Sequence, residues 1–299
     1  MADRRRIAGR GDCASHRFGE AGQEKFAPDL RAGASPPPLP VVEIVRPALD
    51  MGRRGLLRVA ATGGAALLAG CDALSRKQGF LDALALAEPL NMRAQRAATG
   101  DRLAREFPAH MISPVFRPNG STDPRTPEYL ALKADGFAAY RLRIRGLVEA
   151  PQEFAMDALR AMPARTQITR HDCVEGWSVI GQWTGVPLAH LLSLARPTAA
   201  ARYVVFHCYD DLLGDGSRYY ESIDMHDALH PQTIAAYALN GAPVPVANGA
   251  PLRMRIERKL GYKQPKYVHT IELTDGYARI AGGRGGTWED HGYDWYGGI

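Results

Sequence analysis

Hydrophobic and polar positions alternate in short runs along the second half of the chain. Residues 140–148, YRLRIRGLV, have the period of a half-buried strand, and residues 201–208, ARYVVFHC, also predict a strand. Residues 154–163, FAMDALRAMP, instead predict a short helix that ends at Pro163, and the run AHLLSLA after residues 185–187 predicts another. We therefore expect an α+β domain with mixed β-sheets and flanking helices.

The first 110 residues differ from the rest. Residues 1–50 are rich in Arg, Gly and Pro and lack periodicity, so we expect them to be disordered or to precede a true start at Met51. Residues 72–110 place Leu and Ala at helical spacing, which predicts a helical tether. Residues 111–299 are expected to form the main domain.

Residues 51–71 have the pattern of an export signal. A twin arginine, Arg53 and Arg54, precedes an apolar run that is too short to cross the ~30 Å core of a bilayer as a helix. The pair resembles the twin-arginine signal, which carries folded proteins, and LAGC at 68–71 resembles a lipobox. We expect a periplasmic or cell-envelope protein with a lipid anchor at Cys71; the alternative is an ordinary basic and apolar segment.

The net charge of +5 does not indicate nucleic-acid binding. Residues 1–70 hold 11 Lys and Arg against 7 Asp and Glu, whereas residues 71–299 hold 26 against 25. The basic excess therefore lies in the segment that we expect to be removed, and no nucleic-acid partner is expected. With 299 residues, 45% of them hydrophobic, the chain is long enough to bury a full core.

The four cysteines leave several chemistries open. They are Cys13, Cys71, Cys173 and Cys208, and no CxxC pair occurs, which argues against a zinc ribbon, thioredoxin-like chemistry or an attached c-type haem. A thiolate is both a soft metal ligand and a nucleophile, so Cys173 is a candidate for either role. The alternatives are a buried structural cysteine and, after export, a Cys173–Cys208 disulfide.

Residues 170–188, RHDCVEGWSVIGQWTGVPL, resemble the molybdenum-ligand segment of the sulfite oxidase family. The closer match is its bacterial single-domain branch, which includes the catalytic subunit of the periplasmic methionine-sulfoxide reductase. The resemblance implies that Cys173 gives its sulfur to molybdenum, beside the two dithiolene sulfurs of molybdopterin. Arg170 is a candidate to balance the charge of this centre, the alternative being a surface arginine.

Further motifs agree with the family in order and spacing between about residues 111 and 280. FRPNGS at 116–121 resembles the loop that caps the pterin, although an Asn-Gly pair alone is usually a turn. NGAPLR at 248–253 and GYKQPK at 261–266 resemble the elements that hold the pterin phosphate. The cofactor-binding residues implied by the resemblance are Asn119, Cys173, Cys208, Asn248, Arg253, Lys263 and Lys266.

Two positions depart from the family pattern. Cys208 stands where the reductase branch has a pterin-contacting threonine, and Gln264-Pro265 stands where it has a Ser-Ile-like pair, which removes one backbone amide. Both changes weaken the transfer of that branch's substrate to this chain. Cofactor binding is still expected.

Residues 253–266 form a basic run. It contains Arg253, Arg255, Arg258, Lys259, Lys263 and Lys266. On a strand, alternate members face opposite sides, so the run predicts either a solvated face or a phosphate pocket built from some of its members.

The resemblance implies a molybdopterin-dependent oxidoreductase acting on a small sulfur-containing substrate, by sulfite oxidation or sulfoxide reduction. We expect no C-terminal dimerisation domain and a monomer. Electrons would pass through a separate partner, a membrane b-type or soluble c-type cytochrome. Two alternatives stay open: a cysteine-nucleophile enzyme that uses Cys173 with a histidine, and a non-catalytic binding lipoprotein on the same fold.

Overall fold

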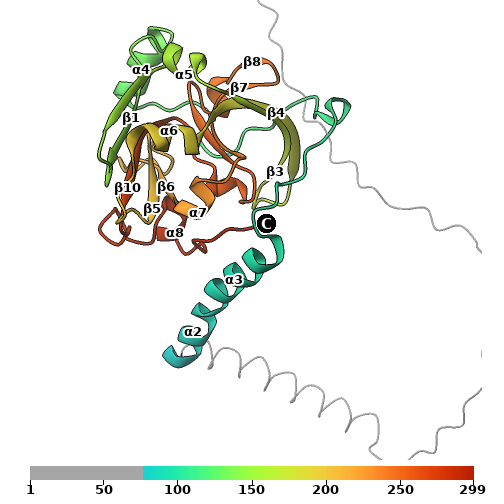
Figure 1. Cartoon of the computed structure of the whole chain (residues 1–299), viewed down its shortest axis with the longest axis vertical. Helices are drawn as coiled ribbons and strands as arrows, with labels where there is room; N and C mark the ends of the chain where they lie inside the picture. The colour runs from blue at the N-terminus through green and yellow to red at the C-terminus, as the bar shows by residue number, and fades with distance from the viewer. Residues whose placement is uncertain (1–76) are drawn as a thin grey trace, which may run out of the picture. The chain divides into compact units, whose positions relative to one another are not determined.

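The structure is a computed structural model that describes residues 77–299 (Figure 1). The predictions for residues 1–50, for the signal at 51–71 and for the Cys71 anchor lie outside these residues. Within residues 77–299, no helix has the length and apolar character needed to span a bilayer.

The first of two sheets is mixed. Its strands are β1 (Arg141–Gly146), β2 (Gln152–Ala155), β5 (Tyr203–Cys208), β6 (Tyr220–Asp224) and β10 (Val268–Thr274). They lie in the order β2-β1-β10-β5-β6, with β1 and β10 parallel and the other neighbours antiparallel. The alternating pattern of β1 buries Leu142 and Ile144 while Arg143 and Arg145 face outward, as its sequence predicts.

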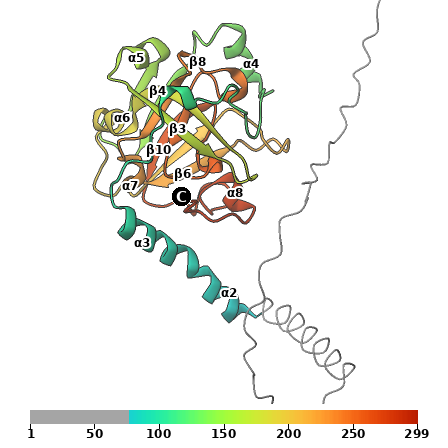
Figure 2. The same cartoon turned by 90° about the vertical axis from the view of Figure 1, so that its right-hand side faces the viewer.

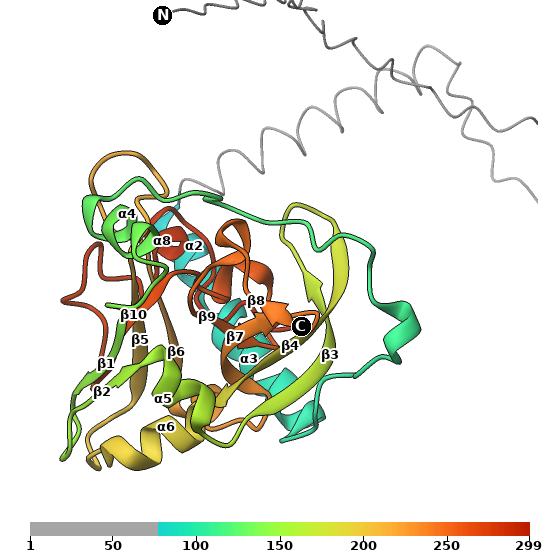
Figure 3. The ribbon, with the colours of Figure 1, turned by 90° about the horizontal axis from the view of Figure 1, so that it is seen from above.

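The second sheet is antiparallel. Its strands are β3 (Arg165–Asp172), β4 (Ser178–Pro187), β7 (Thr233–Leu239), β8 (Ala242–Pro243) and β9 (Arg253–Ile256). The order is β3-β4-β7-β8, and β9 also pairs with β7. β3 and β4 form a long hairpin, seen along one face in Figure 2, and Cys173 lies in the connection between them. Figure 3 shows the two sheets lying side by side.

In residues 77–299, three helices connect consecutive strands, three precede the first strand and one follows the last. They are α2 (Gln78–Ala85), α3 (Ala87–Thr99), α4 (Pro127–Ala134), α5 (Met156–Ala161), α6 (Leu188–Ala195), α7 (Met225–Ala228) and α8 (Thr287–Asp290), with short 3-10 turns η1 (Ala109–Met111), η2 (Val246–Asn248) and η3 (Gly261–Lys263). The helices predicted around residues 154–163 and 189–195 are confirmed as α5 and α6. Leu188, Leu191, Leu192 and Ala195 of α6 recur at helical spacing and are all buried.

Two apolar clusters hold the sheets together. The larger joins both sheets with α5 and α6, and the smaller packs Phe116 edge-on against the fully buried Trp183. Apolar burial of this kind contributes about 25 cal/mol per Å². The two clusters therefore fix the position of the β3–β4 connection relative to residues 116–121 and β7.

Helix α3 is fastened to the domain by charged and polar contacts. Arg96 bonds Asp224 at 2.7 Å and Asp227 at 2.9 Å, and the Tyr296 amide donates to Glu88 Oε1 at 2.7 Å. Helices α2 and α3 thus lie in the segment where the sequence predicts helices. Their role as a tether stays a prediction.

Candidate active site

Cys173 lies in a tight turn between β3 and β4. The Cys173 amide donates to Trp177 O at 2.9 Å, and the Gly176 amide donates to Cys173 O at 3.0 Å. Gly176 has φ 84°, which favours glycine. The Cys173 side chain is buried, and this burial raises its pKa while the backbone N–H of Glu175 acts in the opposite direction. The turn therefore presents a mainly protonated thiol with amide donors beside it.

The Cys173 turn borders a cavity of about 120 Å³. We call it the Cys173 cavity. Its walls come from segments that are distant in the sequence: residues 119–121, 173–175, 210 and 212, 219, 261 and 262, 264–266, 288 and 293. The fold thus brings the predicted Asn119, Cys173 and Lys266 together at one site.

Two buried cations form no ion pair with a carboxylate within the described residues: Lys266, which lines the cavity, and Arg253, which lies behind it. Arg253 donates to the carbonyls of Asn248 at 3.0 Å and Gln264 at 3.2 Å. Lys266 Nζ donates to the carbonyls of Asn119 at 2.6 Å, Ala247 at 3.0 Å and Ser121.

Desolvation is the main cause of a lowered pKa in both groups: to about 9 for Arg253, with the charge of Arg255 contributing, and to about 7 for Lys266, with that of Arg253 contributing. A buried charge without a counter-ion is costly. The pair therefore marks a place for an anionic ligand.

The other four cations of the basic run are paired, and all of them except the partly exposed Arg258, which bonds Asp227 at 3.1 Å, are buried. Arg255 bonds Glu257 at 2.6 Å, Lys259 bonds Asp227 at 3.0 Å, and Lys263 bonds Glu221 and Glu289 at 2.5 Å each. The solvated-face alternative is therefore wrong, because all four residues of β9 are buried. The expected alternation is confirmed in β9: Arg253 and Arg255 both lie over the Trp183 ring, whereas Met254 and Ile256 pack in the larger apolar cluster.

Lys263 does not line the Cys173 cavity. Its burial lowers its pKa, but the two carboxylates more than offset this, so the pKa is raised overall and the ammonium is fixed between them. A contact between Lys263 and a cofactor stays a prediction, to which this geometry adds no support.

Asn248 and Cys208 lie near the site without lining the cavity. Buried Asn248 donates from Nδ2 to Phe116 O at 3.3 Å and accepts from Arg253 through its carbonyl. Next to it, Gly249 has φ 114°, and a β-carbon there would meet the β-carbons of Lys266 and Arg253 at 3.0 and 3.1 Å. Cys208 is fully buried, and its burial raises its pKa well above the usual value.

Arg170 points away from the Cys173 cavity. The period of β3 places its side chain outside, where Nε bonds Asp172 at 2.8 Å and the side chain is 55% exposed. The structure thus does not bring Arg170 to Cys173, and its catalytic role stays a prediction.

Two alternatives for the cysteines find no support. Cys173 and Cys208 are both free, so the predicted disulfide alternative is wrong in this structure. No hydrogen bond joins a histidine to the Cys173 sulfur in residues 77–299, and the neighbouring His171 bonds Arg255 at 2.9 Å. A catalytic cysteine needs a lowered pKa, whereas that of Cys173 is raised.

Asp210 is a site residue that the sequence did not reveal. It lines the cavity, is only 3% exposed, and desolvation raises its pKa to about 6 although nearby Lys266 acts to lower it. In the sequence it is one of several acids in a turn. Its burial depends on pairing with residue Tyr219 across the β5–β6 connection, where the Tyr219 amide donates to Asp210 O at 2.9 Å.

The donor set of the cavity fits molybdopterin. Four buried polar atoms on its wall have no hydrogen-bond partner: Asn119 Oδ1, Ser121 Oγ, Asp210 Oδ1 and Gln264 Oε1. Buried polar atoms are rarely left unpaired, so the amide and carboxyl oxygens are available to accept from N–H groups of a pterin and the Ser121 hydroxyl to donate to a C=O. The two unpaired cations suit its phosphate, and the Cys173 thiol suits a soft metal.

The protein alone does not offer a complete set of metal ligands in the part that the structure describes. No group of three or more His, Cys, Asp or Glu in residues 77–299 is placed to hold a metal ion. A metal at Cys173 would therefore take its other ligands from an organic cofactor.

Residues 129–279 match the family described as oxidoreductase molybdopterin binding domain, and the chain belongs to this family. The protein is thus a molybdopterin-dependent oxidoreductase of the sulfite oxidase type. The predicted family and α+β fold class are confirmed.

Two relatives agree with this assignment. The chain is 39% identical over 249 residues to the putative protein-methionine-sulfoxide reductase subunit YedZ1 of Azospira oryzae, covering 82% of this chain and 87% of that protein. It is 34% identical over 160 residues to the protein-methionine-sulfoxide reductase catalytic subunit MsrP of Xanthomonas campestris, covering 50% of each chain. The sulfane dehydrogenase SoxCD of Paracoccus pantotrophus gives a TM-score of 0.42 at 23% identity, covering 46% of this chain and 39% of that one.

Proposed function

We propose that this chain binds molybdopterin in the Cys173 cavity and reduces methionine sulfoxide or a similar small sulfoxide. The observation that carries the proposal is Lys266, a buried cation without an ion-paired carboxylate that lines the same cavity as the Cys173 thiol, with the buried Arg253 next to it behind the cavity wall. The names of the relatives, methionine-sulfoxide reductase subunits, support the choice of substrate.

In this proposal, different side chains of the chain bind different parts of the cofactor. Cys173 provides the protein sulfur for the metal, and Lys266 and Arg253 bind the phosphate, which also relieves their unpaired charge. Asn119 and Gln264 offer their unpaired oxygens to N–H groups of the pterin. When bound, the cofactor supplies two electrons to the substrate and accepts its oxygen atom.

Entry of the cofactor requires the cavity to open. At about 120 Å³ it is smaller than the ~300–1,000 Å³ of ligand pockets. Lys266 holds residues 119–121 closed through the Asn119 and Ser121 carbonyls, so a phosphate that draws Lys266 away would release this loop. The same cation thus holds this loop closed and would bind the incoming group.

The substrate would meet an apolar and aromatic part of the wall. Leu212, Trp288 and Tyr293 line the cavity, and the rings of Trp288 and Tyr293 lie 5.3 Å apart. Such a surface suits the methyl and methylene groups of a thioether and excludes water. Reduction of a sulfoxide consumes two electrons and two protons and releases a sulfide and water, so the site also needs a proton donor.

Asp210 is the proposed donor, and its pKa of about 6 gives a pH prediction. The protonated form is lost as the pH rises through 6, so kcat/KM should fall across this range. Asp210→Asn should remove this fall of kcat/KM with rising pH. Below pH 6 it should lower kcat/KM by about 10²-fold, which is the lower end of the effect of a general acid. The measurement is a pH profile with reduced viologen as the donor. Asp215→Asn, in the same turn and exposed, is the control; an unchanged profile in Asp210→Asn contradicts the role.

Activity tests the substrate. Full-length protein from a molybdenum-sufficient host is expected to oxidise reduced viologen when methionine sulfoxide is added, and to leave sulfite unchanged with ferricyanide as acceptor. Oxidation of sulfite without any reduction of sulfoxide would overturn the proposed direction and substrate while leaving the cofactor assignment in place.

We also propose the location and partner. Residues 51–71 would direct export by the twin-arginine route to the periplasm or cell envelope, with Cys71 as the lipid anchor. The relatives are named as subunits, which supports a separate electron-supplying subunit. A membrane b-type or soluble c-type cytochrome is the proposed partner.

A further inference from the structure

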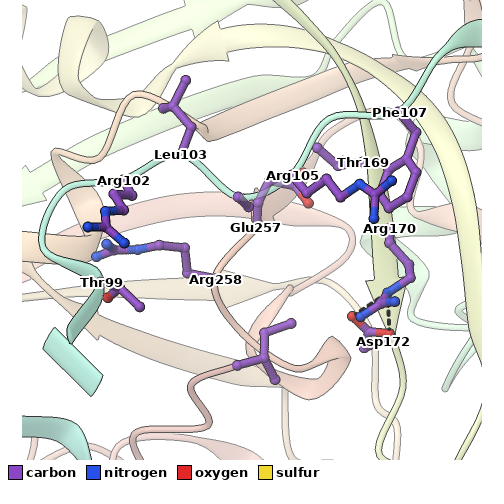
Figure 4. Close-up of a pocket in the computed structure, with 12 residues that line it drawn as sticks. Thr99, Arg102, Leu103, Arg105, Phe107, Thr169, Arg170, Asp172, Glu257 and Arg258 are labelled. Atoms are coloured by element: carbon purple, nitrogen blue, oxygen red, sulfur yellow. Dashed lines mark hydrogen bonds and ion pairs between the residues drawn. The ribbon is translucent and has the colours of Figure 1, made fainter. Parts of the chain in front are cut away.

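A second and larger cavity lies next to the strand that leads to Cys173. It has a volume of about 460 Å³ and is lined by parts of residues 99–107, by the end of β3, by residues 257 and 258, and by Ile299. We call it the arginine cleft. Figure 4 shows Arg102 and Arg258 at one end of this cleft and Arg105 and Arg170 at the other.

The backbone that carries Arg102 and Arg105 is held in place. The side-chain amide of Gln232 accepts from Ala104 N at 2.7 Å and donates to Ala104 O at 3.1 Å. The Phe107 amide donates to Ile168 O at 2.8 Å, and the His230 ring contacts Arg102 O at 3.3 Å. The wall is thus built before any ligand binds, which lowers the entropic cost of binding.

The carboxylates of the cleft are already neutralised. Glu257 accepts two bonds from the buried Arg255, at 3.0 and 2.6 Å. Asp172 accepts from Arg170 and from Ser178. Neither acid is therefore free to balance a further arginine.

Arg102 and Arg105 have no ion pair or side-chain hydrogen bond to any of residues 77–299; the Arg105 guanidinium only lies over the Phe107 ring at 4.8 Å. Arg258, at the Arg102 end, already donates to Gly100 O and to Asp227. The cleft therefore has one unpaired guanidinium at each end. Between them it exposes Leu103, whose surface is 52% accessible.

We propose that the arginine cleft binds an elongated organic dianion, with one carboxylate or phosphate at Arg102, a second at Arg105, and an apolar middle against Leu103. Guanidinium groups bind such oxyanions through paired, charge-assisted hydrogen bonds. The proposal stands on the cleft alone and does not depend on the cofactor at Cys173.

The position of the cleft lets a bound ligand influence the Cys173 turn. Arg170 lines the cleft three residues before Cys173, so their backbones are at most about 10 Å apart. An oxyanion at Arg105, at the Arg170 end of the cleft, would also attract Arg170 and so weaken its ion pair with Asp172, whose carboxylate accepts from Ser178 at the start of β4. Occupancy of the cleft is thereby linked to both strands that flank the Cys173 turn.

Calorimetric titration of the full chain at low ionic strength tests the proposal. The probes are adipate, a dicarboxylate; hexanoate, its monoanionic counterpart of equal length; and a short polyglutamate peptide. Adipate should bind saturably and at least about tenfold more tightly than hexanoate. Arg102→Ala and Arg105→Ala should each reduce adipate binding to the level of hexanoate. Arg125→Ala, at a 79% exposed arginine outside the cleft, should not change it.

The peptide distinguishes two sources of the same chemistry. Binding of adipate identifies a free small molecule as a sufficient ligand, and binding of the peptide alone identifies paired carboxylates displayed by a partner protein; both support the proposal. Because Arg102 and Arg105 are exposed, each variant should keep the wild-type melting temperature. Absence of saturable binding by any probe, or equal binding by folded Arg102→Ala and Arg105→Ala, overturns it.

Discussion

Cys173→Ser is expected to lower sulfoxide reduction by on the order of 10³-fold or more, or about 4 kcal/mol of transition-state stabilisation, while the protein stays folded. An alcohol does not ionise at neutral pH and is a poor ligand for a metal that prefers sulfur. The turn itself should survive, because the bonds between Cys173 and Trp177 and between Gly176 and Cys173 involve only backbone atoms. Steady-state kinetics with reduced viologen, beside circular dichroism of each variant, is the measurement.

Cys208→Ser is the matched control for this change. Cys208 is fully buried on β5 and does not line the Cys173 cavity, so its loss should change kcat by only a few fold. The buried hydroxyl should instead lower the free energy of unfolding by about 1–3 kcal/mol. A folded Cys208→Ser protein as inactive as Cys173→Ser would contradict this account and would restore Cys208 to the cofactor site that the resemblance implies.

Lys263→Met and Lys266→Met should change different properties of the protein: the first its stability and the second its pterin content. Lys263 lies between Glu221 and Glu289, so its removal leaves two buried carboxylates without a cation and should cost about 3–5 kcal/mol of stability. Lys266 has no carboxylate partner among residues 77–299, so Lys266→Met should change the stability of the empty protein by less than about 2 kcal/mol. The lost carbonyl bonds of Lys266 are offset by removal of its unpaired charge. Its main effect should be loss of pterin.

The pH dependence of the free energy of unfolding gives a second test of the role of Lys266. The pKa of Lys266 is lowered from 10.5 to about 7, so between these values the unfolded chain binds the proton and the folded chain does not. Stability of the empty wild-type protein should therefore gain a rising contribution with pH across this window, and Lys266→Met should lack it. Denaturant unfolding and the fluorescence of extracted pterin are the measurements. Normal pterin content in Lys266→Met, with loss in a stable Lys263→Met, would reverse the assignment.

The sequence correctly predicted those elements and motifs that depend on a single local segment. β1, β5, α5 and α6 were predicted from local sequence patterns, and the ordered motifs around Cys173, Asn119, Arg253 and Lys266 meet at one cavity or directly behind it. The period of 2 in β3 also explains the case of Arg170: adjacency to Cys173 suggested a shared site, but a residue three positions earlier on a strand faces the opposite side.

Other features depend on contacts between distant segments. Lys263 belongs to the same motif as Lys266, yet its partners Glu221 and Glu289 lie 42 and 26 positions away in the chain. The raised pKa of Asp210 arises from tertiary burial, which outweighs the opposing charge of Lys266. No local sequence pattern indicates this burial. The basic run of residues 253–266 likewise could not be identified as buried without its carboxylate partners.

The molybdenum and pterin content of the exported full-length protein tests the central claim most directly. Mass spectrometry should find close to one molybdenum and one pterin per chain, with a changed Mo(V) resonance in Cys173→Ser and little pterin in Lys266→Met. Well-folded protein from a molybdenum-sufficient host that contains neither would contradict the account, because the unpaired Arg253 and Lys266 would then have a purpose other than a pterin phosphate.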